Sequence, residues 1–303
     1  MTNDTLLKKL ERPGKKVRAV LDTDAYNEID DQFAVAYMLK KPEFFDVLAL
    51  TAAPFHNDRS DGPETGMELS YDELLKLLKL MDREDMQDRV FKGSKAYLID
   101  EKTPVDSPAA RELVRLSNTA TSDEPLYIIA IGAITNVASA ILLDPSIIER
   151  CVIVWLGGNA HHWRDTREFN MQQDVAAARV VFDSRAPVVQ LPCAGVVSEL
   201  KTTAPELNYW LKGKNKICDY LAESTIAEAE SYAKGTAWSR VIWDVSAIAW
   251  FISDSFMSER IEPIPICEYE HQYTFDSNRH PYKYIDYINR DAVFTDLFKT
   301  LVE

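Results

Sequence analysis

The chain has 303 residues, of which 34 are Lys or Arg and 48 are Asp or Glu, for a formal net charge of −14. This surplus of negative charge opposes non-specific binding to nucleic acids and to anionic membranes, so we expect neither as a partner. Hydrophobic residues make up 46% of the sequence, which excludes a disordered chain and predicts a sizeable core. The length is compatible with a single α/β domain over residues 1–303.

Short apolar runs alternate with helix-period segments in the first part of the chain. The predicted strands cover 17–22, 47–52, 127–132, 152–158 and 188–191. Helical patterns follow the first four of them, at 30–40, 70–82, 134–143 and 173–182. Such alternation predicts βαβ units. The strands are apolar throughout, which is typical of strands covered on both faces. We therefore predict an α/β fold with an open, mostly parallel sheet and helices on both of its faces.

The C-terminal part of the chain shows a different pattern. Helices are predicted over 216–235 and from Asp244 onward. The aromatic-rich segment 267–288 surrounds a turn at 276–281, which predicts a β-hairpin. We expect these elements to form a helical and hairpin extension of the α/β layer.

Four isolated cysteines form no CxxC pair, which argues against a zinc ribbon or a disulfide framework. They are typical of thiols in a reducing compartment. The N-terminal residues are charged and contain no apolar signal region, and no later run is long enough for a membrane helix. We expect a cytoplasmic protein.

The first predicted strand ends in an unusual concentration of acidic residues, Asp22, Asp24, Glu28, Asp30 and Asp31. In open α/β sheets, ligands bind beyond the carboxyl ends of the strands, where this cluster lies. Clustered carboxylates repel one another unless a cation neutralises them, and a divalent ion with oxygen ligands does so well. Asp30 and Asp31 could instead cap the following helix. Capping does not explain Asp22 and Asp24, so the whole cluster favours a calcium or magnesium site.

Further polar residues follow other predicted strands. The carbonyl of Ile134 or Thr135 could supply another oxygen ligand, whereas Asn136 taken alone is more typical of a helix N-cap. Asp244 taken alone is also more typical of a cap.

After the fourth predicted strand, Glu168 and Asn170 could grip adjacent hydroxyls of a sugar, although a surface loop is equally compatible with them. His161, His162 and Trp163 could act as an acid or as stacking groups, or belong to a solvated loop.

Four sequence blocks in order resemble the inosine-uridine-preferring nucleoside hydrolase family. DTDAYNEIDDQFA resembles the acidic N-terminal signature of that family, and IGAITNVASAI resembles its Leu-Gly-Pro-Leu-Thr-Asn block. WLGGN followed by EFNMQQDVAAARVVF resembles its Gly-Gly and Glu-Phe-Asn block, and DVSAIAW its late Asp segment. Each block is weak alone, but their common order over residues 17–250 is a strong signal.

The resemblance implies a Ca²⁺-dependent enzyme that cleaves the N-glycosidic bond of ribonucleosides and forms homo-oligomers. It implies that Asp24 is the base for a metal-bound water. The implied metal ligands are Asp24, Asp31, Asp244 and the Thr135 carbonyl, and the implied ribose-binding residues are Asp30, Asn57, Glu168 and Asn170.

The sequence departs from the family pattern at two places. Five residues separate Asp24 from Asp30 where the family commonly has three, so the turn must bulge. Trp243 stands where many members have the His that protonates the departing base, and Trp cannot deliver a proton at neutral pH. Either His161, His162 or His56 replaces that acid, or the base stacks on Trp163, Trp238 or Trp243.

Two other functions remain open from the sequence. Asp22-Thr23-Asp24 also fits a Mg²⁺-dependent phosphatase of the Asp-x-Asp type, although that function leaves Asp30, Asp31 and Asp244 unexplained. A nucleoside-binding or ribose-binding protein of the same fold that has lost catalysis is the third possibility, because the usual His is missing.

Overall fold

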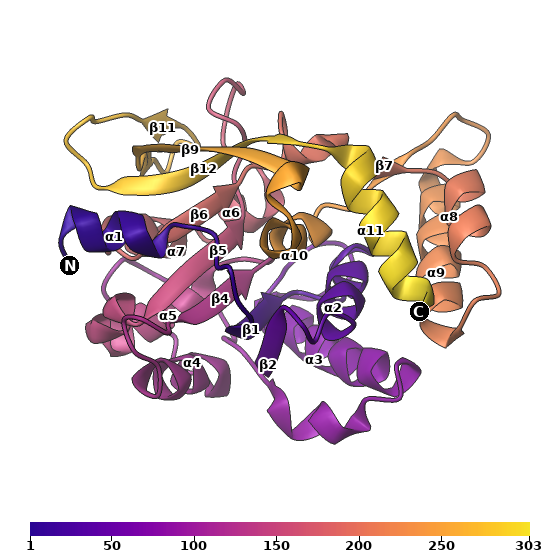
Figure 1. Ribbon diagram of the computed structural model, residues 1–303, viewed down its shortest axis with the longest axis horizontal. Coiled ribbons are helices and arrows are strands. Elements are labelled where there is room, and N and C mark those ends of the chain that lie inside the picture. Colours follow the sequence, from indigo (N-terminus) through magenta and orange to yellow (C-terminus); the bar gives the residue numbers. More distant parts are fainter.

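The computed structural model describes residues 1–303, and an eight-stranded sheet runs through it in the order β3-β2-β1-β4-β5-β6-β12-β9 (Figure 1). Its strands are β1 (Val17–Thr23), β2 (Phe45–Ala52), β3 (Val90–Phe91), β4 (Leu126–Ala130), β5 (Cys151–Leu156), β6 (Val188–Leu191), β9 (Met257–Pro263) and β12 (Pro281–Ile288). Every neighbouring pair is parallel except β9 with β12. The predicted open, mostly parallel sheet is confirmed.

Helices cover both faces of this sheet, as predicted. On one face lie α1 (Asn3–Lys9), α2 (Asp31–Leu39), α3 (Pro63–Leu80) and α10 (Val245–Ile252). The helices α8 (Ala204–Trp210), α9 (Lys216–Ala233) and α11 (Arg290–Val302) extend that core, with α9 against α2 and α3 and α11 against α2 and α10. On the other lie α4 (Pro108–Asn118), α5 (Thr135–Leu143), α6 (Phe169–Gln173) and α7 (Val175–Asp183). Alternate residues of β1 belong to the two cores, with Leu21 on the first and Val20 on the second.

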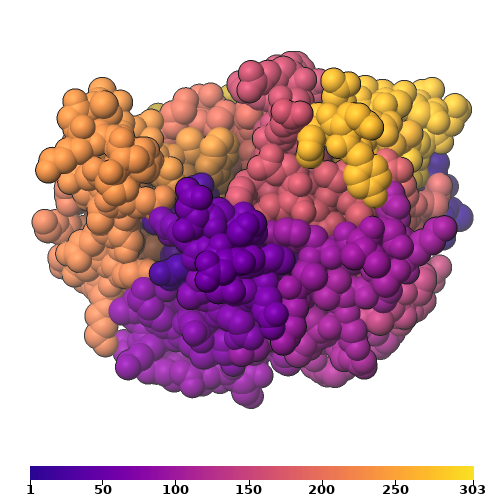
Figure 2. All heavy atoms as spheres, turned by 180° about the vertical axis from the view of Figure 1, so that it is seen from behind, coloured from indigo at the N-terminus to yellow at the C-terminus, as the bar shows by residue number.

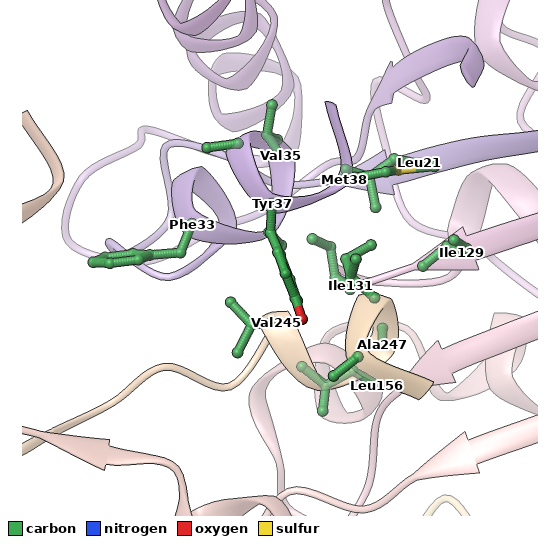
Figure 3. Close-up of a cluster of buried hydrophobic side chains, with 14 of the residues drawn as sticks. Leu21, Phe33, Val35, Tyr37, Met38, Ile129, Ile131, Leu156, Val245 and Ala247 are labelled. Atoms are coloured by element: carbon green, nitrogen blue, oxygen red, sulfur yellow. The ribbon is translucent and has the colours of Figure 1, made fainter. Parts of the chain in front are cut away.

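The apolar packing of α2 against α10 determines where the site forms. Figure 3 shows Tyr37 of α2 beside Val245 and Ala247 of α10, close to Ile131 and Leu156 at the ends of β4 and β5. All of these side chains are buried. Because α2 and α10 are hydrophobic nearly all round, burial of both helices brings their N-termini together above the strand ends.

The C-terminal segment differs from the predicted hairpin. The strand β12 does not pair across the turn at 276–281; it lies parallel to β6 and antiparallel to β9 in the main sheet. Two short pairs, β10 (Ile266–Cys267) with β11 (Tyr273–Thr274) and β7 (Lys201–Thr202) with β8 (Arg240–Val241), stand outside this sheet. The extension therefore contains an antiparallel pair, β10 with β11, but both of its strands precede the predicted turn.

Several boundaries also differ from the sequence prediction. The helix α3 begins at Pro63 rather than Ser70, and the helix expected over 173–182 is preceded by the short α6. Seen from behind, the surface of α9 lies beside that of α3, which Figure 2 shows in orange and violet. No helix is both long and apolar enough to cross a membrane.

Candidate active site

The predicted site residues come together at the carboxyl ends of the parallel strands. One pocket there has a volume of about 370 Å³. Of the predicted residues, it is lined by Asp24, Asp30, Asp31, Glu168, Asn170 and Asp244. Thr135 and Asn57 do not line it. A pocket at this edge is the usual ligand site of an open α/β sheet.

Three acidic side chains form the closest cluster in the pocket. Carboxylate oxygens of Asp30, Asp31 and Asp244 all lie within 4.8 Å of one another, and the three residues are buried. Asp30 and Asp244 occupy the N-cap positions of α2 and α10, but neither side chain makes a capping hydrogen bond. Instead, Asp30 Oδ2 accepts a hydrogen bond from the Trp243 N–H at 3.0 Å. Helix capping therefore does not account for these acids.

Asp24 approaches the same cluster from the end of β1. Both of its carboxylate oxygens are buried without a hydrogen-bond partner. Burial raises the pKa of Asp24 well above its usual range, and the nearby Asp31 raises it further. At the end of β4, a Cβ at Gly132 would lie 2.9 Å from Asp24 Oδ1, so the absence of a side chain there leaves room for the carboxylate.

The electrostatics of the cluster favour a bound cation. Burial raises the pKa of Asp31 to about 7, although Thr23 Oγ1 donates a hydrogen bond to its Oδ1 at 2.5 Å. Burial also raises the pKa of Asp244, followed by repulsion from Asp30 and Asp31. Unpartnered, buried carboxylate oxygens are suitable ligands for a hard divalent cation. The residues present therefore fit a Ca²⁺ or Mg²⁺ ion.

Glu168 and Asn170 form the opposite wall, after β5. The Glu168 carboxylate caps α6, because its oxygens accept hydrogen bonds from the Asn170 and Met171 N–H groups at 2.9 and 3.0 Å. Its Oε2 also accepts from the Gly158 N–H at 2.8 Å. Asn170 Nδ2 donates to the carbonyls of Ile131 and Leu156, both at 3.0 Å. Both side chains are thus held in fixed orientations at the pocket wall.

The two predicted residues outside the pocket have other contacts. The Thr135 hydroxyl donates to Asp174 Oδ2 at 2.7 Å, and Thr135 begins α5. Asn57 Nδ2 donates to Asn27 Oδ1 at 2.7 Å.

Asn136 and Asp22 lie beneath the pocket. Asn136 does not cap α5; it donates to Asp22 Oδ1 at 2.8 Å and accepts from the Ser94 N–H at 2.7 Å. Thr51 also donates to Asp22 Oδ1, at 2.6 Å. Asp22 does not line the pocket, and its Oδ2 is buried without a hydrogen-bond partner.

None of the five histidines lines the pocket. His161 instead stacks on Tyr284, with ring centroids 4.1 Å apart, and its ring nitrogens contact Tyr282 Oη at 2.8 Å and Glu262 at 3.2 Å. Burial lowers the pKa of His161 to about 4. Trp163 and Trp243 do line the pocket, together with the cationic side chains Arg164 and Arg167. Trp238 does not.

Several residues of the pocket were not predicted from the sequence. Asn27 belongs to the longer turn of the acidic motif, and its position between Asp24 and Asp30 was a usable signal. Arg164 and Arg167 lie in a polar loop with no recognisable motif. Cys193 follows β6, and burial, followed by the nearby Glu168 carboxylate, raises the pKa of its thiol. No sequence signal pointed to Cys193, because its proximity to Glu168 depends entirely on the tertiary fold.

The open parallel sheet and the carboxylate cluster beyond its strand ends define an α/β enzyme with oxygen ligands for a divalent cation. A model of the inosine-uridine preferring nucleoside hydrolase family matches residues 19–293. The chain therefore belongs to this family, whose members are N-ribosyl hydrolases. The predicted family and enzyme class are confirmed.

Curated relatives agree with this assignment. The chain is 27% identical over 251 residues to the pyrimidine-specific ribonucleoside hydrolase RihA of Citrobacter koseri, and the match covers 74% of this chain and 76% of that protein. It is 30% identical over 183 residues to RihA of Escherichia coli O1:K1. That second match covers 53% of this chain and 55% of the relative, so the chain spans about half the length of the E. coli protein.

Solved structures show that the whole fold is shared. The plant nucleoside hydrolase PpNRh1 superimposes with a TM-score of 0.73 at 20% identity, over 96% of this chain and 99% of that one. The purine-preferring ribonucleoside hydrolase from Gardnerella vaginalis superimposes with a TM-score of 0.74 at 17% identity, over 94% and 98%.

Proposed function

We propose that this protein hydrolyses the N-glycosidic bond of a ribonucleoside or a related N-riboside, giving the free base and ribose, and that it requires Ca²⁺. The observation that carries the proposal is the pocket in which Asp24, Asp30, Asp31 and Asp244 meet across from Glu168 and Asn170. It places oxygen ligands for a cation on one side and polar groups suited to a sugar on the other.

The metal would be held by the side chains of Asp24, Asp31 and Asp244, with the Thr135 carbonyl as the proposed main-chain ligand. The two unpartnered oxygens of Asp24 support this assignment, because buried acceptors without donors are costly unless a cation neutralises them. When bound, Ca²⁺ lowers the pKa of a coordinated water and orients it. Asp24 would accept the proton of that water.

The remaining residues would act on the sugar. As the base departs, C1′ acquires oxocarbenium character, which nearby carboxylates stabilise electrostatically. Asp30, Glu168 and Asn170 would hold ribose hydroxyls. Asn57, proposed from the resemblance as a fourth sugar ligand, lies outside the pocket and contacts Asn27 instead.

Departure of the base needs stabilisation that a histidine does not supply in this pocket. Arg164 and Arg167 could neutralise the negative charge that develops on the base, and Trp163 and Trp243 offer faces for stacking. Such a site should work best on bases that leave readily as anions. The curated relatives are pyrimidine-specific, whereas the Gardnerella structure is purine-preferring, so we propose no base preference from them.

The direct test is release of reducing sugar. Purified protein with about 1 mM CaCl₂, on the order of ordinary weak calcium sites, is incubated with a panel of purine and pyrimidine ribonucleosides. We expect sugar from at least one of them, no sugar after chelation with EGTA, and recovery on addition of Ca²⁺. If no nucleoside yields ribose, hydrolysis is refuted. Tight nucleoside binding by calorimetry in the same samples would then favour a protein that has lost catalysis.

The phosphatase alternative has less support. An Asp-x-Asp phosphatase uses the first Asp as nucleophile, which here is Asp22. Its Oδ1 accepts hydrogen bonds from Thr51 and Asn136, and the residue does not line the pocket. Hydrolysis of a generic phosphate ester that depends on Asp22 would revive this alternative.

Three further properties belong to the same proposal. We propose that residues 1–303 act as one domain, because a single sheet carries the site and both helical layers. We also propose a homo-oligomer, on the basis of the family resemblance. A reducing compartment is in keeping with four cysteines that are buried and unpaired.

A further inference from the structure

Five residues, 25–29, separate Asp24 from Asp30 in the turn between β1 and α2, and the middle one, Asn27, lies in the pocket wall. Asn27 is 8% exposed and lines the pocket between Asp24 and Asp30. Its main-chain N–H donates to the Asp24 carbonyl at 2.7 Å. The bulge is thus a folded turn with a defined side-chain direction.

A neighbouring loop fixes the orientation of the Asn27 amide. Asn57 Nδ2 donates to Asn27 Oδ1 at 2.7 Å and approaches the Asn27 carbonyl at 3.3 Å. Asn57 Oδ1 in turn accepts a hydrogen bond from the Arg59 N–H at 2.9 Å. Turning the Asn57 side-chain amide by 180° would break this bond, so its orientation is fixed. Because Asn27 Oδ1 is engaged as an acceptor, Asn27 Nδ2 is the group left to serve as a donor.

Other contacts hold the turn in place. Gln32 Nε2 donates to the Ala25 carbonyl at 2.7 Å, and the Arg59 guanidinium contacts the Glu28 carbonyl at 3.2 Å. The Arg240 guanidinium pairs with the Glu28 carboxylate at 2.6 Å. The turn is therefore fixed from α2, from the loop after β2 and from β8. Such multiple support is what a preoriented binding group requires.

Three asparagines line the pocket, and they differ in the hydrogen bonds that their side-chain NH₂ groups make. Asn170 Nδ2 donates to two strand carbonyls, and Asn159 Nδ2 donates to the Asp165 carbonyl at 3.1 Å. Asn27 Nδ2 makes no hydrogen bond within the protein. Most other polar side chains that line the pocket are carboxylates, which accept hydrogen bonds but do not donate them when ionised. Ribose hydroxyls that donate to carboxylates still need a donor for their own oxygens.

We propose that Asn27 binds a ribose hydroxyl through Nδ2, and that Asn57 acts behind it as a positioning residue. This inference rests on the proposed hydrolysis of N-ribosides and adds a substrate contact to it. It accounts for two observations together: Asn27 lines the pocket, and Asn57, which does not, donates a hydrogen bond to the Asn27 amide.

The sharpest test is Asn27→Asp. The aspartate keeps the size of the side chain and an acceptor for Asn57 Nδ2, but it removes the donor. For the best ribonucleoside substrate we expect kcat/KM to fall about 10- to 100-fold, mainly through KM. The same substitution at the exposed Asn118, far along the chain in α4, adds one negative charge without touching the pocket and serves as the control.

Deoxy analogues identify the hydroxyl. Against the 2′-, 3′- and 5′-deoxy forms of the substrate, Asn27→Asp should lose its effect for one analogue, because that analogue already lacks the contact. Asn57→Ala should raise KM more than it lowers kcat, and should add nothing in the Asn27→Asp background. If Asn27→Asp folds poorly, Asn27→Ala is compared with the same analogues.

The possible results distinguish failure of the proposed function from failure of the assignment of Asn27. No sugar release by the wild type refutes the proposed function itself. An active wild type whose Asn27 variants stay within about twofold, or lose the same factor on all three deoxy analogues, refutes the assignment of Asn27 alone.

Discussion

Replacement of Asp31 by asparagine tests whether the acidic cluster exists to hold a cation. The amide side chain would keep the size and an acceptor for Thr23 Oγ1 but would remove one buried negative charge. In the metal-free protein this charge is unfavourable, because burial raises the pKa of Asp31 from 3.8 to about 7. We therefore expect Asp31→Asn to stabilise the metal-free protein while it abolishes the response to Ca²⁺.

The magnitude follows from this pKa. Each pKa unit corresponds to about 1.4 kcal/mol, so ionised Asp31 costs the metal-free fold about 4 kcal/mol above pH 7. An unfolding entropy of about 2.1 cal/mol/K per residue gives about 0.6 kcal/mol/K for 303 residues. The expected rise in Tm is thus up to about 6 °C at pH 8.

The sign of the pH dependence is also determined. A carboxyl group with a raised pKa in the folded state binds its proton more tightly there, so its destabilising effect declines as the pH falls from 7 and is absent only below the ordinary value of 3.8. At pH 5 Asp31 is largely protonated in the folded protein. The Tm difference between wild type and Asp31→Asn should therefore be largest at pH 8 and less than half as large at pH 5.

Differential scanning calorimetry in EGTA and in CaCl₂ measures both effects. Asp174→Asn is a matched control, because Asp174 is also buried but accepts hydrogen bonds from Leu98, Thr135 and Ala177 outside the pocket. It should change Tm by the same amount with and without Ca²⁺, because the hydrogen bonds that it weakens lie outside the acidic cluster. A lower Tm for metal-free Asp31→Asn, or a full Ca²⁺ response in that variant, would show that the cluster does not function as a cation site.

Three other variants test separate parts of the site. Asp24→Asn should lower kcat about 10²- to 10⁴-fold, as expected for loss of a general base, and an unchanged kcat in the sugar-release assay would exclude that role. Gly158→Ala should raise KM and lower Tm. Gly158 has φ +72°, and a Cβ there would lie 2.2 Å from Tyr273 Oη, so the substitution would displace the N–H that binds Glu168. An unchanged KM would contradict this expectation. His161→Gln should keep kcat within about threefold, since His161 lies outside the pocket, whereas a large loss would reinstate it as the acid.

The parts of the fold that depend on local sequence could be predicted. The apolar strands and the acidic turn after β1 are contiguous, and the position of ligands at strand ends follows from the topology of parallel sheets. Asp244 could be joined to the cluster only through the family resemblance. The physical reason for its approach, the packing of α10 on α2, is a contact between segments far apart in the chain.

The features that were missed are non-local. Strand β12 pairs with β6 and β9 rather than across the adjacent turn, and no local pattern distinguishes these partners. The placement of His161 against Tyr282 and Tyr284 likewise depends on β12. The hydrogen bond from Asn57 to Asn27 depends on the exact path of the turn after β1, which the spacing of residues alone does not determine.

The contact between α2 and α10 joins two segments that are far apart in the sequence. An ion held by both Asp31 and Asp244 would act as a removable cross-link between segments 213 residues apart in sequence, the difference between their positions. If the link persisted in the unfolded chain, the lost conformational entropy of closing a loop of this length would raise the free energy of that chain by on the order of 5 kcal/mol. Chelation would remove that link, and the N-termini of α2 and α10 would then be held together by the apolar packing of the two helices alone.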